Sequence, residues 1–329
     1  MPNYQGVWSL STQFQAQGVG NWTFALNDLA FFGAFSTSSS LYGTNTIEIA
    51  RISSTGNTTD FGDLLYNMTY TPAGFSSDTR GIFAGGYTDD GGLGYLNVIQ
   101  YLTMATYGNM SDFGDLTLTA AFTSGCSNST RGLVNGGDRG GSKSNVIDYV
   151  TIASTGNATD FGDLLTESER PAACASSTRG IVAGGESNSA FLNTIQYYTI
   201  ATTSNTTDFG DLSNTKSNFS ACSSSTRGLF NGGLASDRST RYNTIDYITI
   251  ASTGNASDFG DLLDGVTDTA STSNSTRGLT AGGHTSSSTY TNVIQYVTIA
   301  STGNATDFGD LSTSVKYASA FSDGHGGLS

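Results

Sequence analysis

Hydrophobic and polar positions along this chain alternate over short stretches, separated by turn residues. Residues 171–212 illustrate the pattern. A run of small residues (172–177) comes first, followed by an apolar stretch that ends at Gly184-Gly185, an Ile- and Tyr-rich stretch (194–200) and a stretch around Phe209. No window keeps apolar residues at spacings of three and four over more than two turns. The pattern therefore predicts four short β-strands in this stretch and almost no helix.

The same unit recurs six times. Its anchor is the five-residue sequence Asp-Phe-Gly-Asp-Leu, which starts at residues 60, 112, 160, 208, 258 and 307, with successive spacings of 52, 48, 48, 50 and 49. Four strands in about 48 residues is the size of one blade of a β-propeller. Because blades converge at the centre of a propeller, the run of small residues fits the innermost strand and the Phe-bearing stretch fits the outer edge. The sequence predicts an all-β propeller of six four-stranded blades, or seven if residues 3–26 build a partial blade.

The two ends of the repeat array predict how the ring closes. In the first repeat, residues 31–34 replace the Gly-Gly strand, Ile49 stands where later repeats have Tyr, and the repeated Arg is missing. After the sixth anchor, residues 317–321 again have an inner-strand sequence. We expect this C-terminal strand to complete the first blade, since closure removes exposed sheet edges. Residues 1–25 are then an N-terminal arm, and residues 26–329 form the propeller.

Composition and charge narrow the classes of function. The chain has 42 Gly and only 3 Pro, its charged residues amount to 12%, and its net charge is −14. Such an acidic surface repels phosphate backbones, so nucleic acid is not an expected partner. No apolar stretch reaches 18 residues, and the N-terminus has neither a basic n-region nor an apolar h-region. We therefore expect neither a membrane span nor a signal peptide.

Three cysteines, Cys126, Cys174 and Cys222, occupy one repeat position at intervals of 48 residues. Equivalent positions of successive blades lie in separate sheets, so we expect unpaired, buried thiols that act as small apolar residues. The alternative is a three-thiolate metal site around the central channel. We expect no metal and no cofactor.

The second Asp of each anchor is a candidate partner for the Arg of the next Thr-Arg-Gly turn. Period-two alternation places this Asp on the same face as the anchor Phe, and a buried carboxylate requires a partner. The expected ion pairs are Asp63–Arg80, Asp115–Arg131, Asp163–Arg179, Asp211–Arg227 and Asp261–Arg277. The alternative is a ring of metal-binding carboxylates, but two acids per blade are few for a calcium site.

Asn-X-Ser/Thr sequences recur at Asn57, Asn157, Asn205, Asn255 and Asn304. In a secreted eukaryotic protein they would be glycan acceptors. All five fall in the same predicted hairpin turn, where Asn is favoured because it tolerates left-handed backbone geometry. We interpret them as turn residues.

Candidate catalytic residues are scarce. The only histidines, His284 and His325, lie in a variable loop and a Gly-rich tail, and most acids belong to the shared repeat. We therefore expect a non-enzymatic protein whose function resides in the loops that follow Gly-Gly, because these differ in every blade. The candidate binding residues in these loops are Tyr87, Tyr95, Arg139, Phe191, Arg238, Arg241, Tyr242 and Tyr290. The alternative is that these loops are solvated and bind nothing.

The repeat resembles the kelch repeat. The shared features are a small-residue strand, an Arg-Gly turn, an apolar pair before Gly-Gly, a variable loop, a strand with Tyr and a final aromatic strand. The Gly-Gly pairs stand at 85–86, 136–137, 184–185, 232–233 and 282–283, and the tyrosines are Tyr101, Tyr149, Tyr197, Tyr247 and Tyr296. Kelch repeats usually carry Trp on the outer strand, where this chain has Phe61, Phe113, Phe161, Phe209, Phe259 and Phe308. The resemblance is to a kelch relative.

The segment of residues 6–22 and the near-identical Thr-Ile-Ala-Ser-Thr-Gly-Asn-Ala-Thr-Asp-Phe-Gly-Asp-Leu runs resemble structural and tail-fibre proteins of aquatic bacteriophages. This resemblance implies a virion protein, made in the host cytoplasm, that serves as a tail, fibre or capsid-decoration propeller. Trp8 and Trp22, the only tryptophans, would anchor the arm to other virion proteins. The rim loops would bind a host surface polysaccharide. The alternatives are a free kelch-like lectin or interaction scaffold, and a propeller hydrolase or oxidase.

Overall fold

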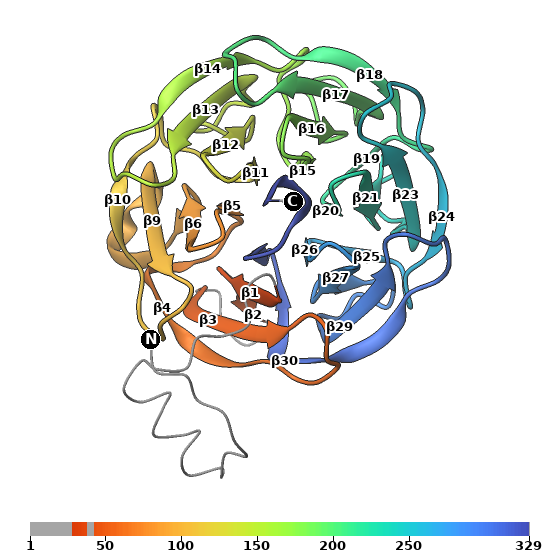
Figure 1. Cartoon of the computed structure of the whole chain (residues 1–329), viewed down its shortest axis with the longest axis horizontal. Helices are drawn as coiled ribbons and strands as arrows, with labels where there is room; N and C mark the ends of the chain where they lie inside the picture. Colours follow the sequence, from red (N-terminus) through yellow and green to blue (C-terminus); the bar gives the residue numbers. More distant parts are fainter. Residues whose placement is uncertain (1–27, 38–42, 329) are drawn as a thin grey trace, which may run out of the picture.

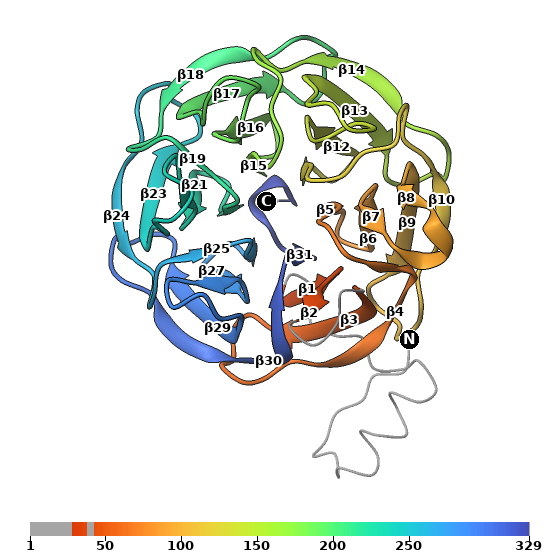
Figure 2. The same cartoon turned by 180° about the vertical axis from the view of Figure 1, so that it is seen from behind.

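A computed structural model describes residues 28–37 and 43–328. Six antiparallel sheets stand around a central axis like the blades of a propeller (Figures 1 and 2). Blade 1 contains β31 (Ser319–Ser322), β1 (Leu29–Gly33), β3 (Thr44–Arg51) and β4 (Thr59–Met68), ordered from the centre outwards. The prediction of six blades is confirmed. Among the described residues, no helix is long and apolar enough to cross a membrane.

The other blades repeat this order of strands from the centre to the edge. Blade 2 contains β5 (Ala73–Ser76), β6 (Arg80–Ala84), β9 (Val98–Thr103) and β10 (Ser111–Asp115); blade 3 contains β11 (Ser124–Ser127), β12 (Arg131–Asn135), β13 (Val146–Thr151) and β14 (Thr159–Asp163). Blade 4 contains β15 (Ala172–Ala175), β16 (Arg179–Ala183), β17 (Thr194–Thr199) and β18 (Thr207–Asp211); blade 5 contains β20 (Ser220–Ser223), β21 (Arg227–Asn231), β23 (Thr244–Thr249) and β24 (Ser257–Asp261). Blade 6 contains β26 (Ala270–Ser273), β27 (Arg277–Ala281), β29 (Thr291–Thr298) and β30 (Thr306–Lys316), with β2 (Ser36–Thr37) added at its edge.

Short elements lie in the loops and connectors between these strands. They are β7 (Tyr87–Thr88), β8 (Gly94–Tyr95), β19 (Lys216–Ser217), β22 (Leu234–Ala235), β25 (Val266–Thr267) and β28 (His284–Thr285), with 3-10 turns at Asp90–Gly92 (η1) and Gly326–Leu328 (η2). Strand β19 pairs with β22, and β25 pairs with β28. These pairings join the loop that follows a Gly-Gly pair to a connector that leads into an inner strand.

The ring closes as the sequence predicts. Strand β31, from the C-terminal end, pairs antiparallel with β1 and becomes the innermost strand of blade 1. Phe31 and Phe321 face each other across this pairing, with stacked rings whose centroids are 5.1 Å apart. One blade is thus built from both ends of the propeller sequence, which closes the ring without an incomplete blade.

The hydrophobic core lies between neighbouring blades. The anchor Phe of each repeat is buried, and in blade 3 the Phe161 ring packs edge-on against Tyr149 of its own blade and tilted against Tyr198 of blade 4. The outer strands therefore carry the aromatic residues that seal one blade against the next. This arrangement agrees with the sequence-based assignment of small residues to the centre and aromatic residues to the edge.

Serine hydroxyls link the innermost strands around the channel. Ser127 Oγ donates to the carbonyl of Ser76 in the preceding blade at 2.7 Å, and Ser223 Oγ donates to the Ala175 carbonyl at 2.8 Å. Ser76, Ser273 and Ser322 repeat the same bond. Blade 4 is the exception, because Ala175 has no hydroxyl to donate to the Ser127 carbonyl.

The Asn residues of the hairpin turns hold adjacent blades together. The Oδ1 atom of Asn205 accepts the backbone N–H of Asp163 in the preceding blade at 3.0 Å, and the other blade junctions show the same bond, made by Asn57, Asn109, Asn157, Asn255 and Asn304. Their turn location is confirmed. The expected reason for Asn is wrong, since none of these Asn residues has a positive φ. The side-chain amide is instead an inter-blade acceptor.

The predicted Asp–Arg ion pairs are wrong. Among the described residues, none of the five pairs Asp63–Arg80, Asp115–Arg131, Asp163–Arg179, Asp211–Arg227 and Asp261–Arg277 forms an ion pair. Arg179 instead stacks on Tyr197 of its own blade, 4.7 Å from the ring centroid, and donates to the Ile250 carbonyl of the next blade at 3.0 Å. The other four arginines make equivalent contacts.

A β-bulge in every outer strand explains the error. In blade 4, Gly210 opposes Ile195 and Asp208 opposes Gln196, so Phe209 is the extra residue in the ladder. A bulge breaks the period of two that placed the Phe and the second Asp on one face. The Asp side chain is therefore not buried with the Phe and requires no partner there.

Candidate functional site

A hollow opens at one end of the central channel, where the connectors enter the innermost strands. Its volume is about 630 Å³, counting the part open to solvent. Each connector contributes the residue two positions before the first residue of the inner strand, and we call these six residues the mouth ring. They are Thr71, Phe122, Arg170, Asn218, Asp268 and Tyr317.

The mouth ring departs from the repeat in its chemistry. Its six positions are equivalent in the fold but hold six different residue types, whereas the anchor sequence is identical in all six repeats. Backbone bonds join neighbours in the ring: Phe122 N–H donates to the Thr71 carbonyl at 3.0 Å, and Arg170 N–H donates to the Phe122 carbonyl at 2.8 Å. The same scaffold therefore presents a different side chain from each of the six connectors around the mouth.

Five mouth-ring residues have backbones in the left-handed region. Their φ angles are 56° for Phe122, Arg170, Asn218 and Tyr317 and 60° for Asp268, although none of them is Gly. Asn and Asp tolerate this left-handed region, but for Phe, Tyr and Arg it is uncommon and costs about 1–3 kcal/mol. Such strain is typical of positions where the side chain has a role that outweighs stability.

Aromatic side chains occupy one half of the mouth. Phe122 and Tyr317 lie with ring centroids 6.1 Å apart, and Tyr70 packs against both, at 4.7 Å from Phe122 and 5.2 Å from Tyr317. Tyr70 in turn contacts Tyr87, one of the predicted rim residues, at 5.2 Å. Burial raises the pKa of Tyr317, so its hydroxyl is neutral and can donate a hydrogen bond.

Polar side chains occupy the other half. Asn218 Nδ2 donates to Asp268 Oδ1, and Thr267 Oγ1 donates to Asp268 Oδ2 at 3.0 Å. The guanidinium of Arg170 lies over the Phe122 ring, 4.1 Å from its centroid, and its buried Nε has no hydrogen-bond partner. An amide, a carboxylate and a guanidinium thus share a small hollow with the aromatic half.

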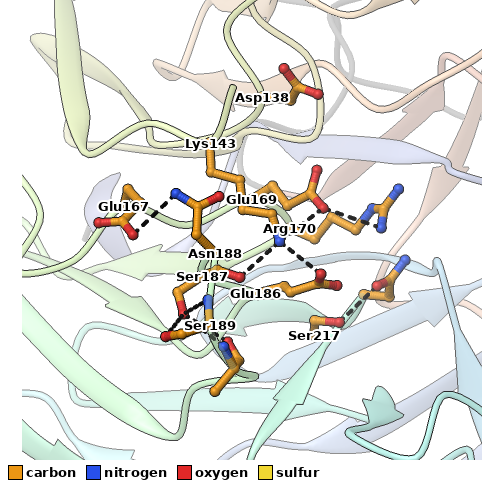
Figure 3. A network of polar contacts seen from close by, with 12 residues as sticks. Asp138, Lys143, Glu167, Glu169, Arg170, Glu186, Ser187, Asn188, Ser189 and Ser217 are labelled. Atoms are coloured by element: carbon orange, nitrogen blue, oxygen red, sulfur yellow. Dashed lines mark hydrogen bonds and ion pairs between the residues drawn. The ribbon is translucent and has the colours of Figure 1, made fainter. Parts of the chain in front are cut away.

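Beside the mouth, charged residues join blades 3 and 4 (Figure 3), and Arg238 extends this network to blade 5. Lys143 Nζ lies 2.7 Å from Glu186 Oε1 and 3.5 Å from Glu169 Oε1, while Arg238 lies 2.8 Å from Glu186. Burial by itself would raise the pKa of Glu186, but the bonds from Lys143 and Arg238 outweigh it and hold this pKa below its ordinary value. Glu186 is therefore ionised and bound to cations.

The predicted rim residues divide into buried and accessible ones. Arg139 is 8% exposed and Phe191 7%, so both belong to the interior, whereas the side chain of Arg238 is 62% exposed. The hydroxyl of Tyr95 donates to Asp138 at 2.8 Å. The interior position of Arg139 and Phe191 corrects their assignment as binding residues. Tyr87, Tyr242, Arg241 and Tyr290 are partly exposed.

The burial of Arg139 was not foreseen from the sequence, and a repeated position in the third strand explains it. The third strand of each blade carries a buried polar residue, namely Glu48, Gln100, Asp148, Gln196, Asp246 or Gln295. Each Gln accepts a backbone N–H from the preceding blade at 2.7–2.8 Å. Each Asp instead has a buried base: Arg139 lies 2.7 Å from Asp148, and Lys216 lies 3.0 Å from Asp246. The sequence carries a signal for these pairs. The third-strand position is Asp in the two blades where a nearby loop or connector holds the base, Arg139 or Lys216.

The opposite end of the channel is closed by the C-terminal segment. His325 Nε2 lies 3.2 Å from both the Ser127 hydroxyl and the Ser76 carbonyl, and burial lowers the pKa of His325 to about 4. Cys126, Cys174 and Cys222 line the channel nearby as free, buried thiols, as predicted. Burial raises the pKa of Cys126 to about 11, so this thiol is protonated and inert at neutral pH. No cluster of three potential metal ligands occurs in the described part of the chain.

No family model and no curated protein matches this chain. What the structure shows is a six-bladed β-propeller. Residues 1–27, including Trp8 and Trp22, lie outside the described residues, so the arm stays a prediction.

Proposed function

We propose that this chain is a non-enzymatic, glycan-binding propeller of a bacteriophage particle, with its binding site at the channel mouth. The observation that carries the binding part is the mouth ring. Six equivalent positions on a nearly constant scaffold hold six different side chains, five of them at a positive φ. Variation confined to one rim of a rigid scaffold is typical of recognition surfaces.

The chemistry of the mouth suits a sugar. A pyranose ring has apolar faces that pack on aromatic rings and equatorial hydroxyls that bond to amides, carboxylates and guanidinium groups. Phe122 and Tyr317 supply the aromatic half, and Asn218, Asp268 and Arg170 supply the polar half. A largely preformed concave site with a few convergent polar groups is the usual form of a small-ligand site.

Several features of the mouth favour binding over catalysis. A glycosidase requires a carboxylic acid with a raised pKa beside a second carboxylate. Glu186 has a lowered pKa, and Glu169 and Glu186 share the ammonium of Lys143. Carboxylates held by ion pairs are poor proton donors. A propeller hydrolase or oxidase therefore ranks below a binding protein.

A glycan array with a matched pair of variants tests the proposal. Asn218→Gly removes a mouth-ring side chain at a φ of 56°, where Gly is favoured, so it is expected to preserve the fold. Arg238→Gly makes the same kind of change at a φ of 58° in a rim loop outside the mouth. We expect the wild type and Arg238→Gly to bind the same glycans and Asn218→Gly to lose them. An array on which the wild type binds no glycan would refute the proposal.

The virion part of the proposal is supported by the resemblance of residues 6–22 and of the repeat to phage structural proteins. It predicts that the chain is present on purified particles at stoichiometric copy number, measured by quantitative mass spectrometry. Absence from particles would favour the second candidate, a free kelch-like lectin or interaction scaffold. That candidate is compatible with the mouth ring, which needs no particle to bind a ligand.

A further inference from the structure

Almost every cation of this acidic chain is already engaged. The chain has 13 Lys and Arg residues against 27 Asp and Glu. Five arginines bond to backbone carbonyls of the next blade, as Arg179 does, and six other cations lie within ion-pair distance of a carboxylate. Only Arg241 and Lys316 make neither contact among the described residues, and Arg241 Nη1 donates to the Ser239 carbonyl of its own loop at 3.4 Å.

These two cations lie near one histidine. Arg241, in the rim loop of blade 5, places its Nη2 atom 3.0 Å from His284 Nδ1 in β28. The buried Nε of Arg241 has no hydrogen-bond partner. Lys316, at the end of β30, places its Nζ atom 4.9 Å from the Tyr290 ring centroid, and Tyr290 packs edge-on against His284 at 5.3 Å. We call Arg241, His284 and Lys316 the basic cluster.

The acids that face the basic cluster are occupied by other groups. Asp237, in the same loop as Arg241, accepts bonds from Ser239 and Thr240. Asp264 accepts bonds from Ser286 and Gly265. Asp268 is held by Asn218 and Thr267. Arg241 and Lys316 therefore have no ion-pair partner among the described residues, and a ligand carboxylate could take that place.

The pKa of His284 reflects both its burial and the charged groups around it. Burial lowers the pKa of His284, and Arg241 and Lys316 lower it further, while Asp268 and a backbone bond at Ser288 act in the opposite direction. The imidazole is consequently neutral at pH 7. Because Nδ1 faces the Arg241 guanidinium as an acceptor, the proton resides on Nε2.

The basic cluster is continuous with the channel mouth. Lys316 Nζ lies 4.8 Å from the ring centroid of Tyr317, the mouth-ring residue that follows it in the chain. A ligand held by the basic cluster would therefore extend over Tyr317 towards Asn218 and Asp268. Guanidinium and ammonium groups are the usual partners of carboxylates, since charge-assisted bonds are about twice as strong as neutral ones.

We infer that the basic cluster is an anion subsite that receives the carboxylate of an acidic sugar, while the sugar ring lies at the mouth. This inference rests on the proposed glycan-binding function and names the class of glycan. The overall negative charge does not oppose it, because repulsion from distant acids is screened beyond about 8 Å at physiological ionic strength. Within that distance the cluster presents two cations that form no ion pair with a carboxylate of the described residues.

Charge-neutralising variants on the glycan array test the subsite. Arg241→Gln and Lys316→Gln are expected to weaken binding of acidic glycans by about tenfold or more, the equivalent of one charge-assisted bond. Arg51→Gln makes the same change of charge at the end of β3, outside the residues that line the mouth, and is expected to leave binding intact. Binding of neutral glycans only, or acidic-glycan binding that both cluster variants retain, would overturn the inference while the proposed function stands.

Proton NMR of the two histidines supplies a readout that does not depend on a glycan array. Titration with D-glucuronate is expected to raise the pKa of His284, because the bound carboxylate offsets the two cations that lower it. His325→Gln assigns the signal, and D-glucose serves as the neutral control. Inorganic phosphate separates the sources of the effect: a response to phosphate but not to glucuronate would overturn the sugar part of the inference. An unchanged His284 pKa with both anions would overturn the subsite altogether.

Discussion

The buried ion pair of blade 5 allows a sharp test of how the blades tolerate charge. Lys216 and Asp246 are 0% and 2% exposed, and their Nζ and Oδ2 atoms lie 3.0 Å apart. At this distance, with an effective dielectric constant of about 20, their attraction is about 5–6 kcal/mol. Desolvation costs several kcal/mol for each ion, and accordingly burial lowers the pKa of Lys216. The pair should therefore contribute little net stability, although breaking it should be costly.

The neighbouring blade supplies the matched replacement. Val266 and Gln295 occupy in blade 6 the positions that Lys216 and Asp246 occupy in blade 5, and Gln295 accepts the backbone N–H of Leu263 at 2.7 Å. Lys216→Val alone leaves a buried, unpaired carboxylate and is expected to lower the free energy of unfolding by about 3–5 kcal/mol. Adding Asp246→Gln should restore it to within about 1–2 kcal/mol of the wild type, because an uncharged, bonded amide replaces the orphaned carboxylate.

Urea denaturation of the wild type, both single variants and the double variant measures the coupling between the two residues. An unpaired buried charge is expected to cost several kcal/mol. If Lys216→Val lowers the free energy of unfolding by less than about 1 kcal/mol, the site is hydrated and the assumed burial is wrong. A double variant no more stable than the singles would show that the glutamine introduced by Asp246→Gln does not reproduce the contact that Gln295 makes. Either result would refute the reasoning from repeat equivalence.

Three further predictions follow from the contacts between blades and from the channel. Arg179→Ala removes the stacking on Tyr197 and the bond to the Ile250 carbonyl, so urea denaturation should show a loss of about 1–2 kcal/mol that Lys does not restore. Gly162→Ala would place a Cβ 2.4 Å from the Ser204 carbonyl oxygen, whereas the Cβ of Gly156→Ala, at a similar φ, would meet nothing within 4 Å. Gly162→Ala should therefore lower the free energy of unfolding by at least about 2 kcal/mol more than Gly156→Ala. Equal losses would contradict the steric account. The pKa of His325 falls from 6.5 to about 4 on folding. The stability that depends on its neutral form is therefore present above pH 6.5 and is lost as the pH falls towards 4, by up to about 3 kcal/mol. His325→Gln should lack this part of the acid destabilisation in thermal melts at pH 4–7.

Much of the fold could be predicted because the sequence repeats. Six copies of one anchor determine the number of blades, and the order of small, apolar and aromatic stretches determines which strand is innermost. Even ring closure follows from the inner-strand sequence around Phe321, which pairs with Phe31 as expected. Each of these inferences uses periodicity, which the sequence displays directly.

The contacts between blades could not be predicted in the same way. The bulge at each anchor Phe changes the face on which the following Asp lies, and nothing in the alternation of residues reveals it. The expected pairing of Asp163 with Arg179 failed for this reason. The stacking of Arg179 on Tyr197 depends on strand register, since these residues belong to neighbouring strands of the same blade.

The site was only partly predictable, because it combines positions that are far apart in the sequence. The variable loops after Gly-Gly drew attention to Arg241 and Tyr290, which belong to the face around the mouth. The mouth ring itself was missed, since one variable residue before each inner strand is inconspicuous until the six lie together. Arg139 was chosen for its loop position and proved to be the buried partner of Asp148.

Quantitative glycan binding by the wild type, Asn218→Gly and Arg238→Gly, with melting temperatures recorded in parallel, tests the central claim most directly. We predict that Asn218→Gly melts close to the wild-type temperature, because Gly accepts a φ of 56°, yet binds about tenfold or more weakly, because a mouth side chain is removed. Arg238→Gly should bind like the wild type. Unchanged binding by Asn218→Gly, or a loss confined to Arg238→Gly, would contradict a binding site at the channel mouth.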